Sequence, residues 1–322
     1  MTTHTARRAL IVKTSSLGDV VHALPALTDI KRHCPEVAID WLVEEAFADI
    51  PRLHPAVERV ERCALRRWRQ HLFRAATWRE IRALRLDLRQ TDYDVVLDLQ
   101  GLMKSAWLAR VAHGTRHGYD AASVREPLAS CLYSVRHGVS RQLHAITRNR
   151  LLAAAAFGYA LDGEVDYGLA CAPLAVPTAP TLLCFHGTSR ADKLWPEAQW
   201  RDVLQHFAGR GVRVLLPWGS VEEARRSERL AEGLDGAEVL QPQGLAALAS
   251  WCAGAIGVVG VDTGLTHLAA AAGAPVIALY CGSDAALTGV VGGRAPARNL
   301  GGIGKPPDAE MVLGVAAEIF KQ

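Results

Sequence analysis

The segment VDTGLTHL (261–268) carries the strongest chemical signal in the sequence, because Asp262, Thr263 and Gly264 directly follow an apolar run. A helix that begins near Gly264 would offer unpaired N–H groups and a positive dipole end to an anion such as phosphate. Thr263 and Thr266 would add hydroxyl donors, Asp262 would accept from sugar hydroxyls, and His267 lies on the same helix. The competing interpretation is a capped helix with a satisfied core histidine.

Two further segments have the same layout, a strand-like run followed by polar residues. In HGTSRADKLWP (186–196), Thr188, Ser189 and Lys193 offer two hydroxyls and a point charge, which suits a diphosphate. In PWGSVEE (217–223), Glu223 is placed to accept from ribose hydroxyls. Taken separately, these residues also fit a solvated polar loop and an exposed acid in the first turn of a helix.

An acid also stands at a predicted helix start near the N-terminus. In KTSSLGDVVHALPAL (13–27), Asp19 follows Gly18 after an apolar run. A carboxylate in this place could act as a general base. Helix capping is the alternative role for the same side chain.

The segment 64–90 is rich in arginine with tryptophan, leucine and phenylalanine between, and includes Arg66 and Arg67. A basic and aromatic helix suits an anionic amphiphile or a membrane surface, whereas the simpler interpretation is a solvated basic face. Lys104 and Arg125 would extend this surface. Binding of nucleic acid is the other alternative, although no recognised motif accompanies the basic segment.

Short apolar runs alternate with helical patterns in both halves of the chain, which predicts α/β domains with parallel sheets. The predicted strands lie at 9–13, 37–45, 94–101, 212–219, 254–262 and 275–282, and 180–189 is predicted as a strand that runs into a loop. The Pro- and Ala-rich segment 170–180 predicts a linker between domains at 1–169 and 181–322. Ligands of such sheets bind outside the carboxyl ends of the strands, so we expect two doubly wound domains facing across a cleft.

Composition narrows the function classes. The chain has 322 residues, 50% hydrophobic residues and a net charge of +3, which fits two globular domains. Neither G-x-G-x-x-G nor G-x-x-x-x-G-K-[ST] occurs, so dehydrogenase and P-loop NTPase interpretations lose support.

The seven dispersed cysteines predict reduced thiols. The longest apolar stretch, 151–161, is short of the ~20 residues of a membrane span, so we expect a cytoplasmic protein, peripheral to a membrane at most.

Several of these segments together resemble the lipopolysaccharide heptosyltransferases. The resemblance is carried by KTSSLGDVVHALPAL, RRWR, QGLMKSA, REPLAS, HGTSRADKLWPEAQW, PWGSVEE and VDTGLTHLAAAAGAPVIALY. It implies a GT-B glycosyltransferase with two Rossmann-like domains that transfers L-glycero-D-manno-heptose from ADP-heptose to the first Kdo of Kdo2-lipid A. It further implies inversion at the anomeric carbon and no metal or other cofactor. Addition of a later heptose, as by heptosyltransferase II, is the alternative.

The resemblance also implies roles for the residues. Asp19 would be the general base; Lys193, Thr188 and Ser189 would hold the diphosphate; and Glu223 would bind the ribose. Donor sugar and phosphate would meet Asp262, Thr263, Gly264 and His267, and the acceptor's anionic groups would meet Arg66, Arg67, Lys104 and Arg125. A monomer at the cytoplasmic face of the inner membrane, without nucleic acid, is expected. A non-catalytic nucleotide-sugar sensor is the rival from another class, and it would have no use for Asp19.

Overall fold

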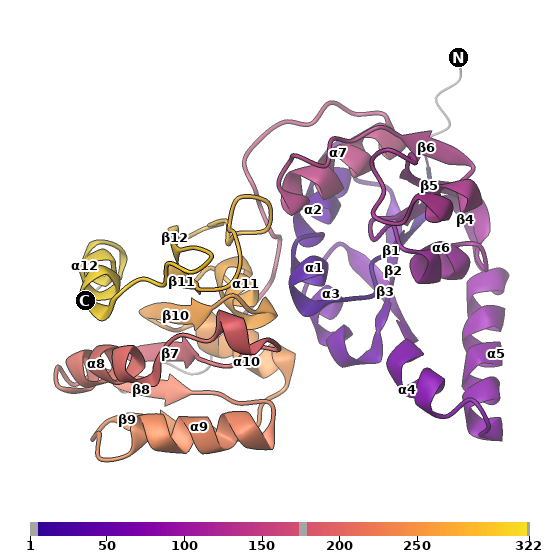
Figure 1. Ribbon diagram of the computed structural model, residues 1–322. Helices are drawn as coiled ribbons and strands as arrows, with labels where there is room; N and C mark the ends of the chain where they lie inside the picture. Colours follow the sequence, from indigo (N-terminus) through magenta and orange to yellow (C-terminus); the bar gives the residue numbers. More distant parts are fainter. Residues whose placement is uncertain (1–5, 174–178, 321–322) are drawn as a thin grey trace. The chain divides into compact units, whose positions relative to one another are not determined.

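The computed structural model describes residues 6–173 and 179–320, and these form two compact units (Figure 1). The division between them falls between Glu164 and Val165. It precedes the linker expected at 170–180, because the Tyr167 hydroxyl already donates to the Val291 carbonyl of the second unit at 2.9 Å. Part of that expected linker, 174–178, lies outside the described residues.

The N-terminal unit is built on a parallel sheet of six strands in the order β3-β2-β1-β4-β5-β6. The order reverses between β1 and β4, as in a doubly wound fold. The strands are β1 Arg8–Val12, β2 Ala38–Glu44, β3 Val57–Cys63, β4 Asp92–Asp98, β5 His113–Tyr119 and β6 Val135–His137. The helices are α1 Leu17–Val21, α2 Leu24–His33, η1 Glu45–Phe47, α3 Asp49–Arg52, α4 Leu65–Gln70, α5 Ala75–Gln90, α6 Met103–Ala109, η2 Pro127–Leu132 and α7 Ala145–Phe157.

The C-terminal unit repeats this plan, with a six-stranded parallel sheet in the order β12-β11-β10-β7-β8-β9. Its strands are β7 Thr181–Phe185, β8 Arg213–Leu216, β9 Ala237–Val239, β10 Gly257–Val261, β11 Val276–Tyr280 and β12 Ala297–Gly301. Its helices are η3 Ala191–Lys193, α8 Glu197–Ala208, α9 Val221–Ala231, α10 Leu245–Ala253, α11 Gly264–Ala271 and α12 Ala309–Ile319. The predicted α/β class with two doubly wound parallel sheets is therefore confirmed.

The apolar runs form strands because both of their faces are covered by helices. In the second unit, Leu182 and Cys184 pack toward α8, α9 and α12, whereas Leu183 and Phe185 pack toward α10 and α11. The side chains of a strand alternate between faces, so a central strand with helices on both sides must be apolar throughout. All seven cysteines are free, and four of them are buried, as predicted for reduced thiols.

Two predicted elements differ in detail. The basic segment 64–90 forms two helices, α4 and α5, with a break at 71–74. The helix expected after Asp19 is also divided: α1 ends at Val21, and α2 begins at Leu24 with Pro25 in its first turn. Proline lacks a backbone N–H and is well placed in the first turn of a helix, so it starts a new helix here.

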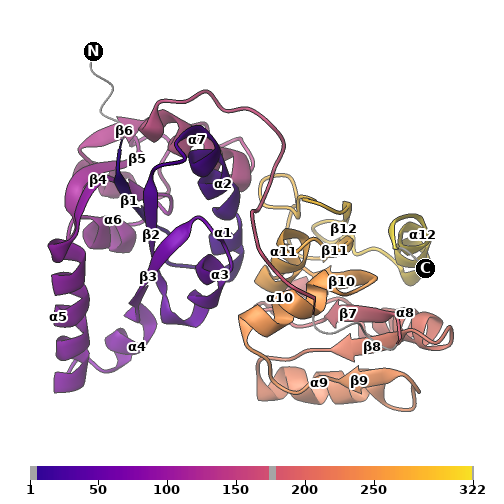
Figure 2. The same cartoon turned by 180° about the vertical axis from the view of Figure 1, so that it is seen from behind.

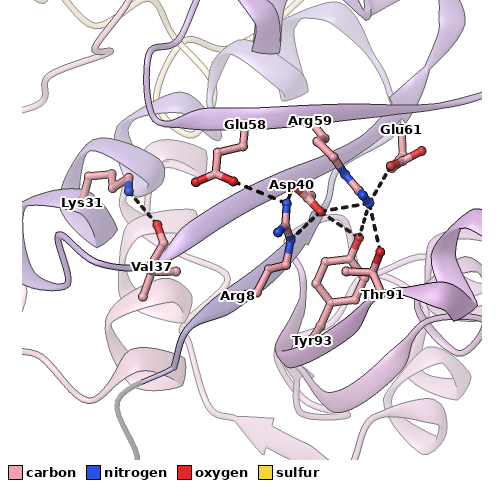
Figure 3. A network of polar contacts seen from close by, with 9 residues as sticks. All are labelled: Arg8, Lys31, Val37, Asp40, Glu58, Arg59, Glu61, Thr91 and Tyr93. Atoms are coloured by element: carbon pink, nitrogen blue, oxygen red, sulfur yellow. Dashed lines mark hydrogen bonds and ion pairs between the residues drawn. The ribbon is translucent and has the colours of Figure 1, made fainter.

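A buried carboxylate joins four strands of the N-terminal sheet (Figure 3). Asp40 of β2 is fully buried and accepts from Arg8 of β1 at 3.0 and 3.1 Å and from the Tyr93 hydroxyl of β4 at 3.0 Å. Arg59 of β3 lies 3.2 Å from the same carboxylate. Because a buried charge is stable only when it is paired, this network fixes the relative positions of the four strands.

We expect Asp40→Ala to destabilise the N-terminal unit. Removing one partner of a buried ion pair typically costs 3–5 kcal/mol, and water can reach the half-exposed arginines, so we expect about 3 kcal/mol. The measurement is the urea midpoint of the protein, read by tryptophan fluorescence. The matched control is Glu238→Ala, which breaks an exposed pair with Arg213 and should cost less than about 1 kcal/mol. Equal shifts for both variants would contradict the structural role of Asp40.

Candidate active site

Four polar loops of the C-terminal unit leave the sheet at the carboxyl ends of adjacent strands. They follow β11, β10, β7 and β8, which are neighbours in that order. The loop after β10 begins with Asp262 and Thr263, and α11 then starts at Gly264. The first N–H groups of a helix have no partner inside it, so an anion site at the start of α11 stays a prediction, while the helix itself begins where the sequence placed it.

Asp262 is the centre of the contacts between these loops. Its Oδ2 accepts from Lys193 Nζ at 2.6 Å and from the Ser283 hydroxyl at 2.5 Å, and its backbone carbonyl accepts from the Thr188 hydroxyl at 3.2 Å. Nε2 of the buried His267 lies 4.0 Å from Asp262 Oδ1. The loops after β7, β10 and β11 are therefore tied to one carboxylate.

These neighbours keep Asp262 ionised. Burial alone would raise the pKa of its carboxyl, but hydrogen bonds from His267, Lys193 and Ser283 outweigh burial and lower the pKa well below the usual range. The ionised Asp262 carboxylate thus holds the Lys193 ammonium near the N-terminus of α11. A point charge on a flexible stem placed there is suited to neutralise a phosphate.

Glu223 lies in the first turn of α9, directly after the loop that follows β8. Its Oε2 accepts from the Gly219 N–H at 2.7 Å, and the carboxylate packs against Gly187. A Cβ atom at position 187 would stand 2.3 Å from Glu223 Oε1, so a larger residue there would displace the Glu223 carboxylate. Glu223 is thereby brought beside the β7 loop that carries Thr188.

The remaining predicted residues of this unit have mixed outcomes. Thr263 is the N-cap residue of α11 with no side-chain cap bond, and Ser189 is exposed in the loop after β7. The expectation that Thr266 offers a hydroxyl to a ligand is wrong, because its hydroxyl is buried and donates to the Val261 carbonyl at 2.7 Å. Ser283 was not assigned a role from the sequence, and its bond to Asp262 depends on a contact 21 residues away.

Asp19 in the N-terminal unit is a capping residue whose carboxylate keeps one oxygen available. Its Oδ2 accepts from both the N–H and the hydroxyl of Ser16, each at 2.9 Å, which closes a capping box at the start of α1. Both Ser16 contacts use Oδ2, so the capping box does not engage Oδ1. The capping interpretation and the general-base interpretation are therefore compatible, because each uses a different oxygen.

Cations surround Asp19 and keep it ionised. Burial acts to raise the pKa of the Asp19 carboxyl, but Lys13, the two Ser16 hydrogen bonds and Arg125 together lower it. Lys13 is itself buried beneath the loop and donates to the Leu99 carbonyl at 2.9 Å. Lys13 was not assigned a role from the sequence. Its position directly after the apolar strand β1 was the signal that could have identified it as a residue of the Asp19 site.

The four predicted acceptor cations fall into two groups. Lys104 of α6 donates to the Ser15 hydroxyl at 3.0 Å, so Lys104 and Arg125 are gathered around the Asp19 loop. Gln100 was not predicted, yet it fixes this loop by accepting from the N–H and the hydroxyl of Thr14 at 2.7 and 2.6 Å.

Arg66 and Arg67 lie apart from that group, on α4 after β3. Arg66 lies over the Phe47 ring at 5.5 Å. The Arg67 guanidinium is bound by Glu45 and Glu80, with a shortest distance of 2.9 Å to each. An anionic acceptor would therefore have to displace two carboxylates to reach Arg67, a competition that the sequence did not reveal.

Within residues 6–173 and 179–320, no group of three or more His, Cys, Asp or Glu side chains is arranged to hold a metal ion. In the same residues, no helix combines the length and the apolar character that crossing a bilayer requires.

Comparison with known proteins decides the family. The model of glycosyltransferase family 9 (heptosyltransferase) matches residues 81–311. The chain belongs to glycosyltransferase family 9. Among curated members, it is 48% identical to lipopolysaccharide heptosyltransferase 1 of Pseudomonas aeruginosa over 88% of the chain and 81% of that protein. It is 46% identical to the protein of the same name of Escherichia coli K12 over 91% of the chain and 95% of that protein.

Solved structures of family 9 heptosyltransferases agree with this assignment. The E. coli heptosyltransferase WaaC with ADP superposes with a TM-score of 0.90 at 43% identity, covering 97% of this chain and 99% of the other. WaaC with ADP-2-deoxy-2-fluoro heptose gives a TM-score of 0.86 at 42% identity, with the same coverage. E. coli ADP-heptose lps heptosyltransferase II, at 19% identity and a TM-score of 0.71, shares the fold, which is the GT-B fold expected from the sequence.

Proposed function

We propose that this family 9 heptosyltransferase moves L-glycero-D-manno-heptose from ADP-heptose to the first Kdo of Kdo2-lipid A. The observation that carries the proposal is the Asp262–Lys193 pair at the head of α11, in a chain 45–48% identical to proteins named lipopolysaccharide heptosyltransferase 1. A helix start, a lysine and hydroxyls are the groups that a nucleoside diphosphate sugar needs. Identity to heptosyltransferase II is far lower, which favours the first transfer over a later one.

The donor is bound by the C-terminal unit in this proposal. The diphosphate lies against the N–H groups of Gly264 and its neighbours, with Lys193, Thr188 and Ser189 as further donors. Glu223 accepts from the ribose hydroxyls, and Asp262, Thr263 and His267 contact donor sugar and phosphate. As the bond between the anomeric carbon and the phosphate oxygen breaks, its electron pair leaves with ADP, and Lys193 neutralises the charge that develops.

The acceptor is activated by the N-terminal unit. Oδ1 of the ionised Asp19 takes the proton of the acceptor hydroxyl, while that oxygen forms the new bond to the anomeric carbon. Attack from the face opposite to the leaving ADP inverts the configuration. Lys104 and Arg125, beside Asp19, hold the acceptor's anionic groups, and Arg66 and Arg67 join them once Arg67 is released from Glu45 and Glu80. We propose no metal for this reaction, since Lys193 and α11 supply the positive charge.

The transfer assay combines ADP-heptose, Kdo2-lipid A and EDTA, with the product detected by mass spectrometry. A gain of one heptose supports donor, acceptor and metal independence together. A gain that appears only after a divalent cation is restored would contradict metal independence. No gain, with ADP-heptose still bound, would point to another acceptor, and competition with heptosylated core would test the later transfer.

A monomer at the cytoplasmic face of the inner membrane is the proposed working form. The acceptor is a lipid, and the chain's basic helices α4 and α5 fit an anionic surface. Sedimentation of the free protein and its co-sedimentation with vesicles test the two statements separately.

Gly187→Ala should weaken donor binding through Glu223. The new Cβ would lie 2.3 Å from Glu223 Oε1, so the carboxylate must leave its position. Losing a hydrogen bond to a charged group costs about 1.5–3 kcal/mol, so KM for ADP-heptose should rise roughly 10- to 100-fold with little change in kcat. Gly314→Ala is the control, because a Cβ at Gly314 meets no atom within 4 Å. An unchanged KM for Gly187→Ala would remove Glu223 from the donor site.

A further inference from the structure

A groove of about 420 Å³ lies between α5 and α6 of the N-terminal unit, and the donor and acceptor sites do not use it. Figures 1 and 2 show the two helices side by side, and their residues Leu84, Leu88 and Ala109 share one hydrophobic cluster with the strands of the N-terminal sheet. The groove is lined by apolar side chains, among them Ile81, Leu88, Trp107 and Val111. Arg85 and Arg89 also line the groove. The volume is within the range of about 300–1,000 Å³ typical of small-ligand sites.

The groove continues into exposed aromatic and apolar surface. Trp107 and Trp78 are 56% and 58% exposed, and Phe73 in the turn before α5 is fully exposed. Trp78 precedes Ile81 and Arg85 at helical spacings of three and seven residues, so the three side chains follow one face of α5. Large exposed aromatic side chains beside an apolar groove mark an interaction surface more often than a solvated one.

The charge of this surface is strongly positive. Residues 64–90 contain eight arginines against only Glu80 and Asp87 as acids. Neither Arg85 nor Arg89 is paired with a carboxylate in the part of the chain that the structure describes, and Arg110, which also lines the groove, lies over the Trp107 ring at 5.8 Å. Unpaired arginines beside an apolar groove favour a ligand with a phosphate head and a hydrocarbon tail.

The arginine end of the groove lies away from the Asp19 loop. Helix α5 ends at Gln90, just before β4 begins at Asp92, and α6 runs from the end of β4 back toward its start. Arg85, Arg89 and Val111 are therefore near the amino edge of the sheet. The Asp19 loop is at the carboxyl edge.

We propose that the α5–α6 groove binds one acyl chain of an anionic membrane phospholipid, with Arg85 and Arg89 at its phosphate. Trp78, Trp107 and Phe73 then rest in the interfacial layer of the bilayer, where amphipathic aromatic rings are favoured. This proposal rests on the proposed location of the protein at the membrane surface, and it names the protein surface and the lipid that make the contact. It concerns a lipid of the bilayer itself, so it requires no acceptor to be present.

The first test is co-flotation of the full chain with vesicles that contain no acceptor. We expect binding to vesicles of phosphatidylethanolamine with 30% phosphatidylglycerol, a composition chosen for the assay, and loss of at least about tenfold in affinity for Arg85→Glu/Arg89→Glu, since each basic residue contributes about 1 kcal/mol at an anionic surface. The matched control is Arg225→Glu/Arg298→Glu, two exposed arginines of the C-terminal unit. Equal loss in both double variants, or wild-type binding by Arg85→Glu/Arg89→Glu, would overturn the proposal.

The second test asks whether a chain enters the groove. Phosphatidylglycerol brominated on its acyl chains should quench tryptophan fluorescence of the bound protein, and Trp107→Phe should remove part of that quenching without lowering binding. Vesicle binding without quenching of tryptophan fluorescence would mean that only electrostatic attraction to the surface operates. That result would overturn the proposal that an acyl chain enters the groove. Heptose transfer to a water-soluble, deacylated acceptor should survive in Arg85→Glu/Arg89→Glu. If the wild type lacks that transfer too, the proposed function fails while the vesicle results still decide the groove.

Discussion

Asp19→Asn is expected to lower kcat for heptose transfer by about 10²- to 10⁴-fold, the usual contribution of a positioned general base. Asparagine keeps an oxygen that can accept from Ser16, so the capping box at the start of α1 should survive. The loss then reports the missing proton acceptor and not a disrupted helix. The measurement is single-turnover transfer at saturating donor and acceptor.

Two controls separate chemistry from folding for Asp19. Asp308→Asn replaces another acid that caps a helix, where Asp308 accepts from the Met311 N–H, and it should leave kcat unchanged. Binding of ADP to Asp19→Asn should match the wild type, because donor contacts are assigned to the other unit. Retained transfer in Asp19→Asn would assign the base elsewhere, and a sensor without catalysis would show binding but no transfer in the wild type.

The pH profile follows from the same surroundings. The pKa of Asp19 is lowered, so the carboxylate is charged above that pKa and activity is lost only as pH falls through it. We therefore expect no acid limb from this group above the ordinary aspartate value of about 3.9. Ser16→Ala removes one hydrogen bond to the carboxylate and should move the limb to higher pH. A limb near pH 6–7 that Ser16→Ala does not move would indicate a different titrating group.

Lys193→Gln is expected to lower kcat by about 10²- to 10³-fold, comparable to removal of one preorganised donor to a developing negative charge. The effect should appear in kcat more than in KM, because the charge on ADP grows as the glycosidic bond breaks. Lys193→Arg should restore little, since a planar fork cannot replace a point charge 2.6 Å from Asp262. The measurement is steady-state transfer over a range of ADP-heptose concentrations.

Lys305→Gln is the matched control for Lys193, because Lys305 is an exposed lysine of the same unit. It should leave both kinetic constants unchanged. A rise in KM alone for Lys193→Gln would mean that the lysine binds donor and leaving group equally and does not assist departure.

The loops at strand ends could be predicted because their signals are local. Asp262-Thr263-Gly264 stands between an apolar strand and a helix, and the structure begins α11 at Gly264 as expected. The pairings could not be predicted, because they depend on which distant side chains the sheet order brings together. Ser283 reaches Asp262 only because β11 lies beside β10, and Arg67 meets Glu45 only because β2 lies beside β3.

The Thr266 hydroxyl shows the same limit within one helix. It was expected to be a second hydroxyl donor beside Thr263, yet it donates to the Val261 carbonyl and is buried. Serine and threonine near helix starts often bond to nearby backbone, and the sequence does not say which carbonyl is free. Lys13 was overlooked for the opposite reason, since a lysine at the end of an apolar strand is seldom buried.

The carboxylate of Asp262 acts as a stand-in anion for Lys193 when no phosphate is bound. On the proposed assignment, an incoming anion must compete with this internal partner and also approach its negative charge. Inorganic phosphate gains little from that exchange, whereas a nucleoside diphosphate sugar adds contacts to Glu223, Thr188 and the α11 N-terminus. The Asp262–Lys193 ion pair would thus lower the affinity for small anions. A ligand that contacts all of these loops would still bind, because its other contacts offset the loss of the ion pair.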